Sequence, residues 1–280
     1  MKILWATLLF LCLSFPAFAD QQITVLTEKT SIGHAVATLP YIDGSMESAL
    51  EKQANGLIKD TAAKLLKEIG NQGHLSYEVV LNRPSLVSLL LMAENDNRKV
   101  YSGLNIDLTT GKEFSVTDYF IDNDKVKELL GNYENVLFSE KGFMLRKEKN
   151  APYSSFVPYE QVIDSMRIGE AGRLMQIARL TQNASGKILK LENCGLIALK
   201  LDSNPSTGYG WEMNCNSSAV VKVGRSFTIP SGKDNMTGVQ GTEIIVLAVT
   251  QPGTYDIRMD YKRAWEKMRL HSFNFTVIVE

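Results

Sequence analysis

The sequence predicts two folded parts: an N-terminal α+β unit, in which a long helix covers an antiparallel sheet, and a C-terminal all-β immunoglobulin-like sandwich. Two observations predict this. Apolar residues recur at helical spacing through residues 45–69. After residue 187, seven segments with alternating apolar residues are separated by turn sequences, as in a sandwich. The length of 280 residues also suits two domains better than one.

The chain begins with a predicted export signal. Lys2 precedes an apolar run over residues 3–15, and the Ala-Phe-Ala segment at 17–19 fits a signal-peptidase site before Asp20. We therefore expect residues 1–19 to be removed and the mature protein to be periplasmic or extracellular. No later stretch reaches the ~18 apolar residues of a membrane span, so we do not expect membrane insertion.

The predicted N-terminal unit covers residues 20–175. Within the helix at 45–69, apolar side chains from Leu50 to Ile69 form one stripe, and Gly70 ends the helix. The other expected elements are an extended start at 23–26, strands at 75–82, 85–94, 98–108, 135–138 and 142–147, a turn at 107–112 and a shorter helix at 122–131. We expect a linker at residues 176–186.

The predicted C-terminal unit covers residues 187–280. The expected strands are 187–192, 196–202, 211–214, 219–229, 242–249, 254–261 and 269–279. In the last of them, Phe273, Phe275, Val277 and Val279 alternate with other residues, as in a strand with one buried face. We assign Trp211, on the third strand, to the core of the sandwich.

Three connections between these strands carry distinctive sequences. They are Asn204-Pro205-Ser206-Thr207-Gly208-Tyr209, Gly238-Val239-Gln240-Gly241 and Arg263-Ala264-Trp265, in the second, fourth and sixth connections. Because successive connections of an antiparallel chain alternate between its two ends, all three should emerge at the same end. Pro205 and Gly208 favour a pre-set first loop, and Arg263 and Trp265 are residue types enriched in binding hot spots. The sequence therefore predicts a binding surface there.

In this order the three segments resemble the signature of chagasin-type inhibitors of papain-like cysteine proteases, which have N-P-[ST]-T-G-[YF], G-x-x-G and R-P-[WF] loops. The resemblance covers about residues 187–280. It implies that the first loop occupies the catalytic cleft of the protease, that the other two grip its sides, and that inhibition is reversible. The implied protease-binding residues are Asn204, Pro205, Ser206, Thr207, Gly208, Tyr209, Gly238, Gly241, Arg263, Ala264 and Trp265.

One position departs from this signature. Ala264 stands where the family has proline. Since proline restricts the unfolded backbone, we expect the third loop to be less rigid and the affinity to be lower by ~1 kcal/mol.

The N-terminal unit has a resemblance of its own. Residues 85–89, 104–120 and 151–153 resemble segments of an exported domain found in bacterial lysozyme-binding anti-sigma factors and some cell-wall deacetylases. This implies an extracytoplasmic interaction module of unknown partner. It leaves two alternatives to protease inhibition: an adhesion or cell-wall interaction protein without inhibitory activity, or lysozyme binding through the N-terminal unit.

Two cysteines remain in the predicted mature chain, Cys194 and Cys215. In an oxidising compartment we expect them to form a disulfide, at the end of the sandwich opposite the three loops. Such a bond closes a loop of about twenty residues and contributes ~3 kcal/mol in the chain-entropy model.

Catalysis, metals and nucleic acids are not expected. His34, His74 and His271 are far apart and lack metal-ligand spacing, and no phosphate-binding loop is present. We therefore expect neither enzymatic activity nor a cofactor, and a structural role for His271. The 30 basic and 31 acidic residues nearly balance, which argues against a nucleic-acid partner.

Overall fold

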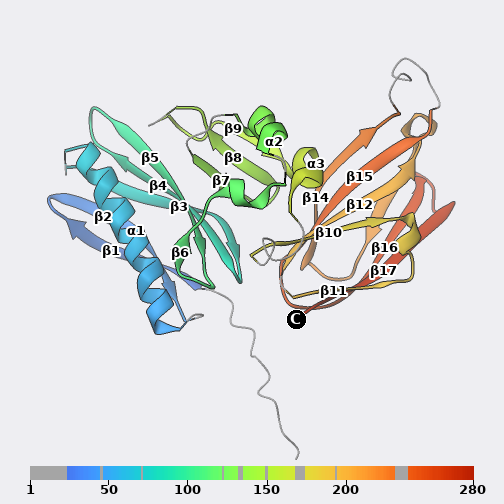
Figure 1. The fold of residues 1–280 in the computed structure, drawn as a ribbon, viewed down its shortest axis with the longest axis horizontal. Helices are drawn as coiled ribbons and strands as arrows, with labels where there is room; N and C mark the ends of the chain where they lie inside the picture. Colours follow the sequence, from blue (N-terminus) through green and yellow to red (C-terminus); the bar gives the residue numbers. More distant parts are fainter. Residues whose placement is uncertain are drawn as a thin grey trace, which may run out of the picture.

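The structure is a computed structural model of the 280-residue chain, shown in Figure 1. It describes residues 24–44, 47–70, 72–121, 123–131, 135–148, 151–167, 174–192, 194–230 and 239–280. The predicted signal peptide, residues 1–19, lies outside these ranges. The described residues are mostly β-strands with few helices, and none of those helices is long and apolar enough to cross a membrane.

A six-stranded sheet forms the N-terminal part, in the order β1-β2-β3-β4-β5-β6. Its strands are β1 (Thr24–Ile32), β2 (Ala35–Asp43), β3 (His74–Arg83), β4 (Leu86–Glu94), β5 (Lys99–Asp107) and β6 (Lys112–Glu113). All neighbours are antiparallel except β2 and β3, which pair in parallel over two residues. A parallel pair needs a crossover, and helix α1 (Ser48–Glu68) supplies it.

Helix α1 covers one face of this sheet, as Figure 1 shows. Its buried stripe includes Ile58, Ala62 and Leu66, which pack with apolar side chains of β2, β4 and β5. The amide of Asn55 both accepts from Ile42 N and donates to Ile42 O, each at 2.9 Å, and so fixes the helix against β2. The predicted long helix against a sheet is confirmed.

A smaller, three-stranded sheet lies on the other face. It contains β7 (Asn135–Phe138), β8 (Gly142–Arg146) and β9 (Ser155–Pro158), with helices α2 (Asn123–Leu130) and α3 (Tyr159–Val162). Asn105 of β5 fixes β7, since its Nδ2 donates to Val136 O at 2.7 Å and its Oδ1 accepts from Phe138 N at 3.3 Å. The shorter helix and the two strands expected in this region are confirmed.

The C-terminal part is a sandwich of two four-stranded sheets. One has the order β10-β12-β15-β14 and the other β11-β17-β16-β13. The strands are β10 (Gln176–Thr181), β11 (Ile188–Leu191), β12 (Gly195–Ser203), β13 (Tyr209–Asn214), β14 (Val220–Thr228), β15 (Gly241–Val249), β16 (Gly253–Arg263) and β17 (His271–Val279). All seven strands expected after residue 187 are present, which confirms the β-sandwich.

One strand of the sandwich was not expected. Residues 176–181, placed in a linker by the sequence, form β10 and pair in parallel with β12. The structure corrects that expectation, because these residues are held by a sheet edge and Ile177 is only 3% exposed.

The sandwich shares a core with the middle of the chain. Along β15, Ile245, Leu247 and Val249 face the second sheet of the sandwich, while Ile244, Val246 and Ala248 belong to the core that includes Phe143 and Tyr159. Residues of β12 alternate in the same way. The sheet β10-β12-β15-β14 is therefore covered on both faces.

The expected disulfide between Cys194 and Cys215 is not present in the structure. Cys194 is 3% exposed and precedes β12, whereas Cys215 follows β13 in the facing sheet. Both thiols pack on the sandwich core. Apolar packing, rather than this covalent bond, therefore joins the two sheets.

Candidate functional site at one end of the sandwich

Strand pairing brings the three distinctive loops to one end of the sandwich. Ser203, the last residue of β12, pairs with Gly241, the first residue of β15. Tyr209, the first residue of β13, pairs with Arg263, the last residue of β16. The shared end that strand alternation predicted is thus confirmed for these loops. Gly238 lies outside the described residues. We call residues 204–209, 239–241 and 263–270 the loop end.

The first loop is held by hydrogen bonds within itself. Pro205–Thr207 form a 3₁₀ turn, in which Gly208 N donates to Pro205 O at 3.0 Å. The N–H and hydroxyl of Thr207 both donate to Asn204 O, at 3.1 and 2.6 Å, and Ser206 Oγ donates to Asn204 Oδ1 at 2.6 Å. Because these polar groups bond locally, the loop keeps its shape without a partner.

Gly208 ends this turn in a conformation that favours glycine. Its φ is +80°, in the left-handed region. A Cβ at this position would lie 3.2 Å from Cη2 of Trp265, so the absence of a side chain also lets the indole approach the first loop. The first and third loops are therefore in contact at the loop end.

Arg263 joins the two loops more firmly. Its Nε donates to Thr207 O at 3.1 Å, and its Cζ lies 4.6 Å from the ring centroid of Tyr209. Its Nη1 also donates to Glu266 Oε1 at 3.1 Å, within the third loop. The guanidinium thus uses its donors and its flat face to hold the first loop against the third.

The third loop begins with a tight turn and exposes apolar side chains. Glu266 N donates to Arg263 O at 3.0 Å, which makes Ala264 the second residue of a four-residue turn. Beyond it, Trp265 is 74% exposed, Met268 82% and Leu270 57%. Such large apolar side chains, gathered on one loop, are typical of an interaction surface.

Aromatic rings on the adjoining strands pack against the loop end. The ring of Tyr261 lies 5.6 Å from that of Tyr209 and 6.4 Å from that of His271, in stacked orientation. Its hydroxyl accepts from Asn204 N at 2.8 Å. Trp211 is 2% exposed and donates to a carbonyl of β12, which confirms its structural role.

Sequence reasoning did not find all of these residues. It omitted Tyr261, whose alternation pattern indicated only a strand, and Met268 and Leu270, which lie beyond the motif. The available signal for the last two was the presence of three large apolar side chains in the seven-residue connection 264–270.

The loop end has the features of a binding surface rather than of a catalytic centre. In the part of the chain that the structure describes, no three His, Cys, Asp or Glu side chains are grouped to hold a metal. The described groups with shifted pKa values all precede residue 160, before the first strand of the sandwich. Bonds to carboxylates raise the pKa of Tyr41 and Lys99, and burial raises that of Tyr159 and brings the pKa of Tyr153 to about 12.

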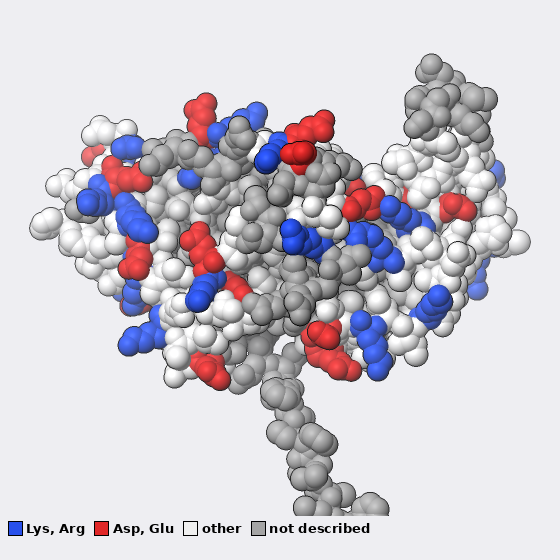
Figure 2. All heavy atoms as spheres, viewed as in Figure 1, with Lys and Arg blue, Asp and Glu red and all other residues white. Residues whose placement is uncertain are grey.

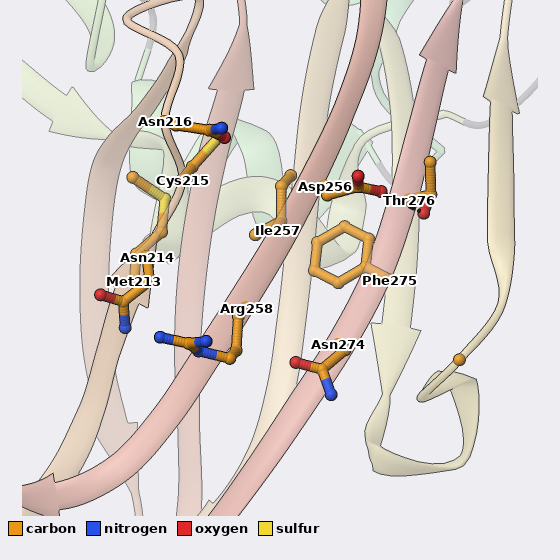
Figure 3. Close-up of a pocket in the computed structure, with 11 residues that line it drawn as sticks. Met213, Asn214, Cys215, Asn216, Asp256, Ile257, Arg258, Asn274, Phe275 and Thr276 are labelled. Carbon is orange, nitrogen blue, oxygen red and sulfur yellow. Dashed lines mark hydrogen bonds between the residues drawn. The ribbon is translucent and has the colours of Figure 1, made fainter.

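An open pocket of about 690 Å³ lies elsewhere on the sandwich, across β13, β16 and β17 (Figure 3). Several of its polar side chains bond to one another or to close neighbours. Thr276 Oγ1 donates to Asp256 Oδ1 at 2.7 Å, and Arg258 Nε donates to Asp260 Oδ2 at 3.1 Å. None of the motif residues lines this pocket, so it is separate from the loop end.

Charged side chains of both signs are interspersed on the face of the molecule shown in Figure 2. No large area of one sign is visible on that face.

Comparison with known proteins identifies the C-terminal part. Residues 191–279 match the chagasin family of peptidase inhibitors, I42. The chain is 28% identical over 102 residues to amoebiasin-2 of Entamoeba histolytica, covering 36% of this chain and 83% of that protein. It is 26% identical over 107 residues to chagasin of Trypanosoma cruzi, covering 36% of this chain and 96% of that protein.

A solved structure is similar over the same region. It is the crystal structure of a cysteine protease inhibitor from Entamoeba histolytica, with 28% identity, a TM-score of 0.34, and coverage of 38% of this chain and 97% of that chain. Members of the family are protease inhibitors and not enzymes. Residues 191–279 of this chain thus form a chagasin-family inhibitor domain.

Proposed function

We propose that this protein is an exported, reversible inhibitor of papain-like cysteine proteases and that it acts through the loop end. The observation that carries the proposal is the contact between the loops: Arg263 bonds Thr207 O and lies over Tyr209, so two loops form one pre-set surface. The similarity to cysteine protease inhibitors supports the class of target. The signal-like N-terminus supports export.

In this proposal the first loop enters the catalytic cleft of the protease. Its apex, Ser206-Thr207-Gly208, is small and exposed, so the backbone can come close to the partner. The side chains of Ser206 and Thr207 already bond to Asn204, so little conformational freedom is lost on binding. The sandwich then serves as an immunoglobulin-like scaffold that presents its loops at one end.

The third loop would hold one side of the cleft. Trp265 offers a large rigid anchor, and Met268 and Leu270 add exposed apolar area beside it. The second loop, which ends at Gly241 beside Ser203, would contact the other side. The described residues of the loop end include no Cys or His that could react with the protease. Inhibition would therefore be competitive and reversible, by occlusion of the cleft.

The test is a titration of papain with residues 20–280, alongside two variants that each remove one exposed apolar side chain. Trp265→Ala should weaken inhibition at least about tenfold, as expected for an interface anchor. Ile188→Ala is the matched control, because Ile188 is 64% exposed but lies on β11. It should inhibit like the wild type. A Gly208→Trp variant should abolish inhibition.

The outcomes separate this proposal from its alternatives. If the folded wild-type chain at micromolar concentration inhibits neither papain nor other papain-like proteases, the inhibitor function is wrong. Binding of the chain to cell-wall material would then support the adhesion alternative. Inhibition of lysozyme by residues 20–175 would support lysozyme binding through the N-terminal unit. The export prediction has its own test: N-terminal sequencing of the secreted protein should give Asp20 as the first residue.

A further inference from the structure

A buried carboxylate lies just below the loop end. Glu243, on β15, is 1% exposed and follows the alternation of Ile245 and Leu247, so it faces the space between the two sheets. Its Oε1 lies 2.7 Å from Arg225 Nε, and its Oε2 accepts from Ser203 Oγ at 2.9 Å. A carboxylate is rarely buried to this extent unless it is paired. Here Oε2 is hydrogen-bonded, whereas Oε1 accepts no hydrogen bond and is balanced by the charge of Arg225.

The partners of Glu243 stand at the ends of two loops. Ser203 is the last residue before the first loop. Glu243 itself comes two residues after Gly241, where the second loop ends. Arg225 is on β14, whose end at Thr228 leads into the second loop. The ion pair therefore joins the two strands on either side of the second loop, and the hydrogen bond from Ser203 links them to the strand that enters the first loop.

The guanidinium of Arg225 also reaches the strand that leaves the first loop. A Cβ on Gly210 would lie 2.6 Å from Arg225 Nη2, so the guanidinium lies directly against the backbone at Gly210. Gly210 belongs to β13, and β13 and β14 are end strands of opposite sheets. Arg225 thus bridges the two sheets beside the loop end.

We propose that the Arg225–Glu243 pair positions the first and second loops relative to each other and thereby determines how tightly the protein inhibits its target. This inference deepens the proposed function and rests on it. Arg225 and Glu243 are positioning residues, because they lie behind the loops and act through Ser203 and Gly210.

The side chain of Arg225 suits this role better than lysine. Its Nε lies 2.7 Å from Glu243 Oε1 while its Nη2 lies against the backbone at Gly210, so one planar group is close to two strands at once. The ammonium group of lysine is a single point of charge and cannot reproduce the fork. Arg225→Lys should therefore keep the charge pair but lose the contact with β13.

A matched control is available in another ion pair of the chain. Lys200 Nζ lies 2.8 Å from Asp164 Oδ2, and this pair joins β12 to the segment after α3, away from the loop residues. If Arg225–Glu243 contributed only to stability, Arg225→Lys and Asp164→Asn should act alike. If the pair positions the loops, only its own variants should change inhibition.

The experiment compares residues 20–280 as wild type, Arg225→Lys, Glu243→Gln and Asp164→Asn. Each is titrated against papain, its melting temperature is measured, and backbone hydrogen exchange is followed over residues 204–209. We expect inhibition by the Arg225 and Glu243 variants to weaken about tenfold and loop exchange to accelerate. Asp164→Asn should inhibit within about twofold of the wild type whatever its melting temperature.

Two results would overturn the inference. One is unchanged inhibition by folded Arg225→Lys and Glu243→Gln. The other is unchanged exchange at residues 204–209 in both variants. Hydrogen exchange needs no protease, so it also distinguishes the two proposals. Faster loop exchange with a wild type that inhibits nothing would refute the proposed function and leave the positioning role of the pair standing.

Discussion

Two glycines with nearly the same backbone conformation allow the loop contact to be tested apart from stability. Gly208 has φ +80° and Gly186 has φ +79°. Placing alanine in this left-handed region costs roughly 1–2 kcal/mol at either position. For a protein of this size, such a loss should lower the melting temperature by about 2–8 °C. The two Gly→Ala variants should therefore be destabilised to a similar extent.

The surroundings of the two positions differ. At Gly186 an added Cβ meets no atom within 4 Å. At Gly208 it would lie 3.2 Å from Trp265 Cη2 and 3.8 Å from Arg263 Nε. Because Trp265 is 74% exposed, the indole can move away, and the contact between the first and third loops loosens. We expect inhibition by Gly208→Ala to weaken about tenfold, or ~1.4 kcal/mol, and inhibition by Gly186→Ala to be unchanged.

The assay is a papain titration at a temperature where circular dichroism shows both variants to be folded. Equal inhibition constants for Gly208→Ala and Gly186→Ala would refute the reasoning, since they would show that the closeness of Gly208 to Trp265 has no part in binding.

Three further predictions concern other parts of the molecule. Ala264→Pro should bind papain about 2–5-fold more tightly in the same titration, because proline suits the second position of the turn that Arg263 O closes. Weaker binding would show that proline does not fit this turn. The fragment 187–280 should melt at a lower temperature than residues 20–280, since it lacks β10 and exposes the apolar side of β12 and β15; an equal melting temperature would contradict the shared core. Burial raises the pKa of Tyr153 to about 12, so the folded chain keeps a proton that the unfolded chain releases near pH 10. The contribution of the protonated Tyr153 to the free energy of unfolding is therefore complete below pH 10 and is lost as the pH rises from 10 to 12. Between pH 10 and 12 the free energy of unfolding should fall by ~2–3 kcal/mol less in Tyr153→Phe than in the wild type, measured by urea titration at each pH. An identical fall in both proteins would show that Tyr153 does not cause the loss.

Local pattern was sufficient to predict much of the sandwich and the site. The alternation of Phe273, Phe275 and Val277 identifies β17, because one face of this strand is buried and the other is not. Counting the strands then places the loops at one end without any knowledge of the packing. The contacts from Arg263 to Thr207 and Tyr209 follow from that placement.

What the sequence did not predict depends on contacts between distant segments. Strand β10 is recognisable only through its parallel pairing with β12, since it has no tight turn to mark it as a hairpin partner. Strand β2 contains Pro40, which argues against a strand when read alone. The Arg225–Glu243 pair joins two strands whose facing side chains only the three-dimensional register shows.

The region similar to known inhibitors is smaller than the unit that holds its loops in place. The family match begins at residue 191, whereas the sheet that carries the first and second loops includes β10, from residue 176. In β15 the side chains of Ile244 and Val246 pack with the middle of the chain, and those of Ile245 and Leu247 pack within the sandwich. A strand enclosed on both faces can shift little, because interiors are close-packed. In the proposed inhibition, the N-terminal part would have a physical role even without touching a protease, because it packs on the strands from which the loops extend.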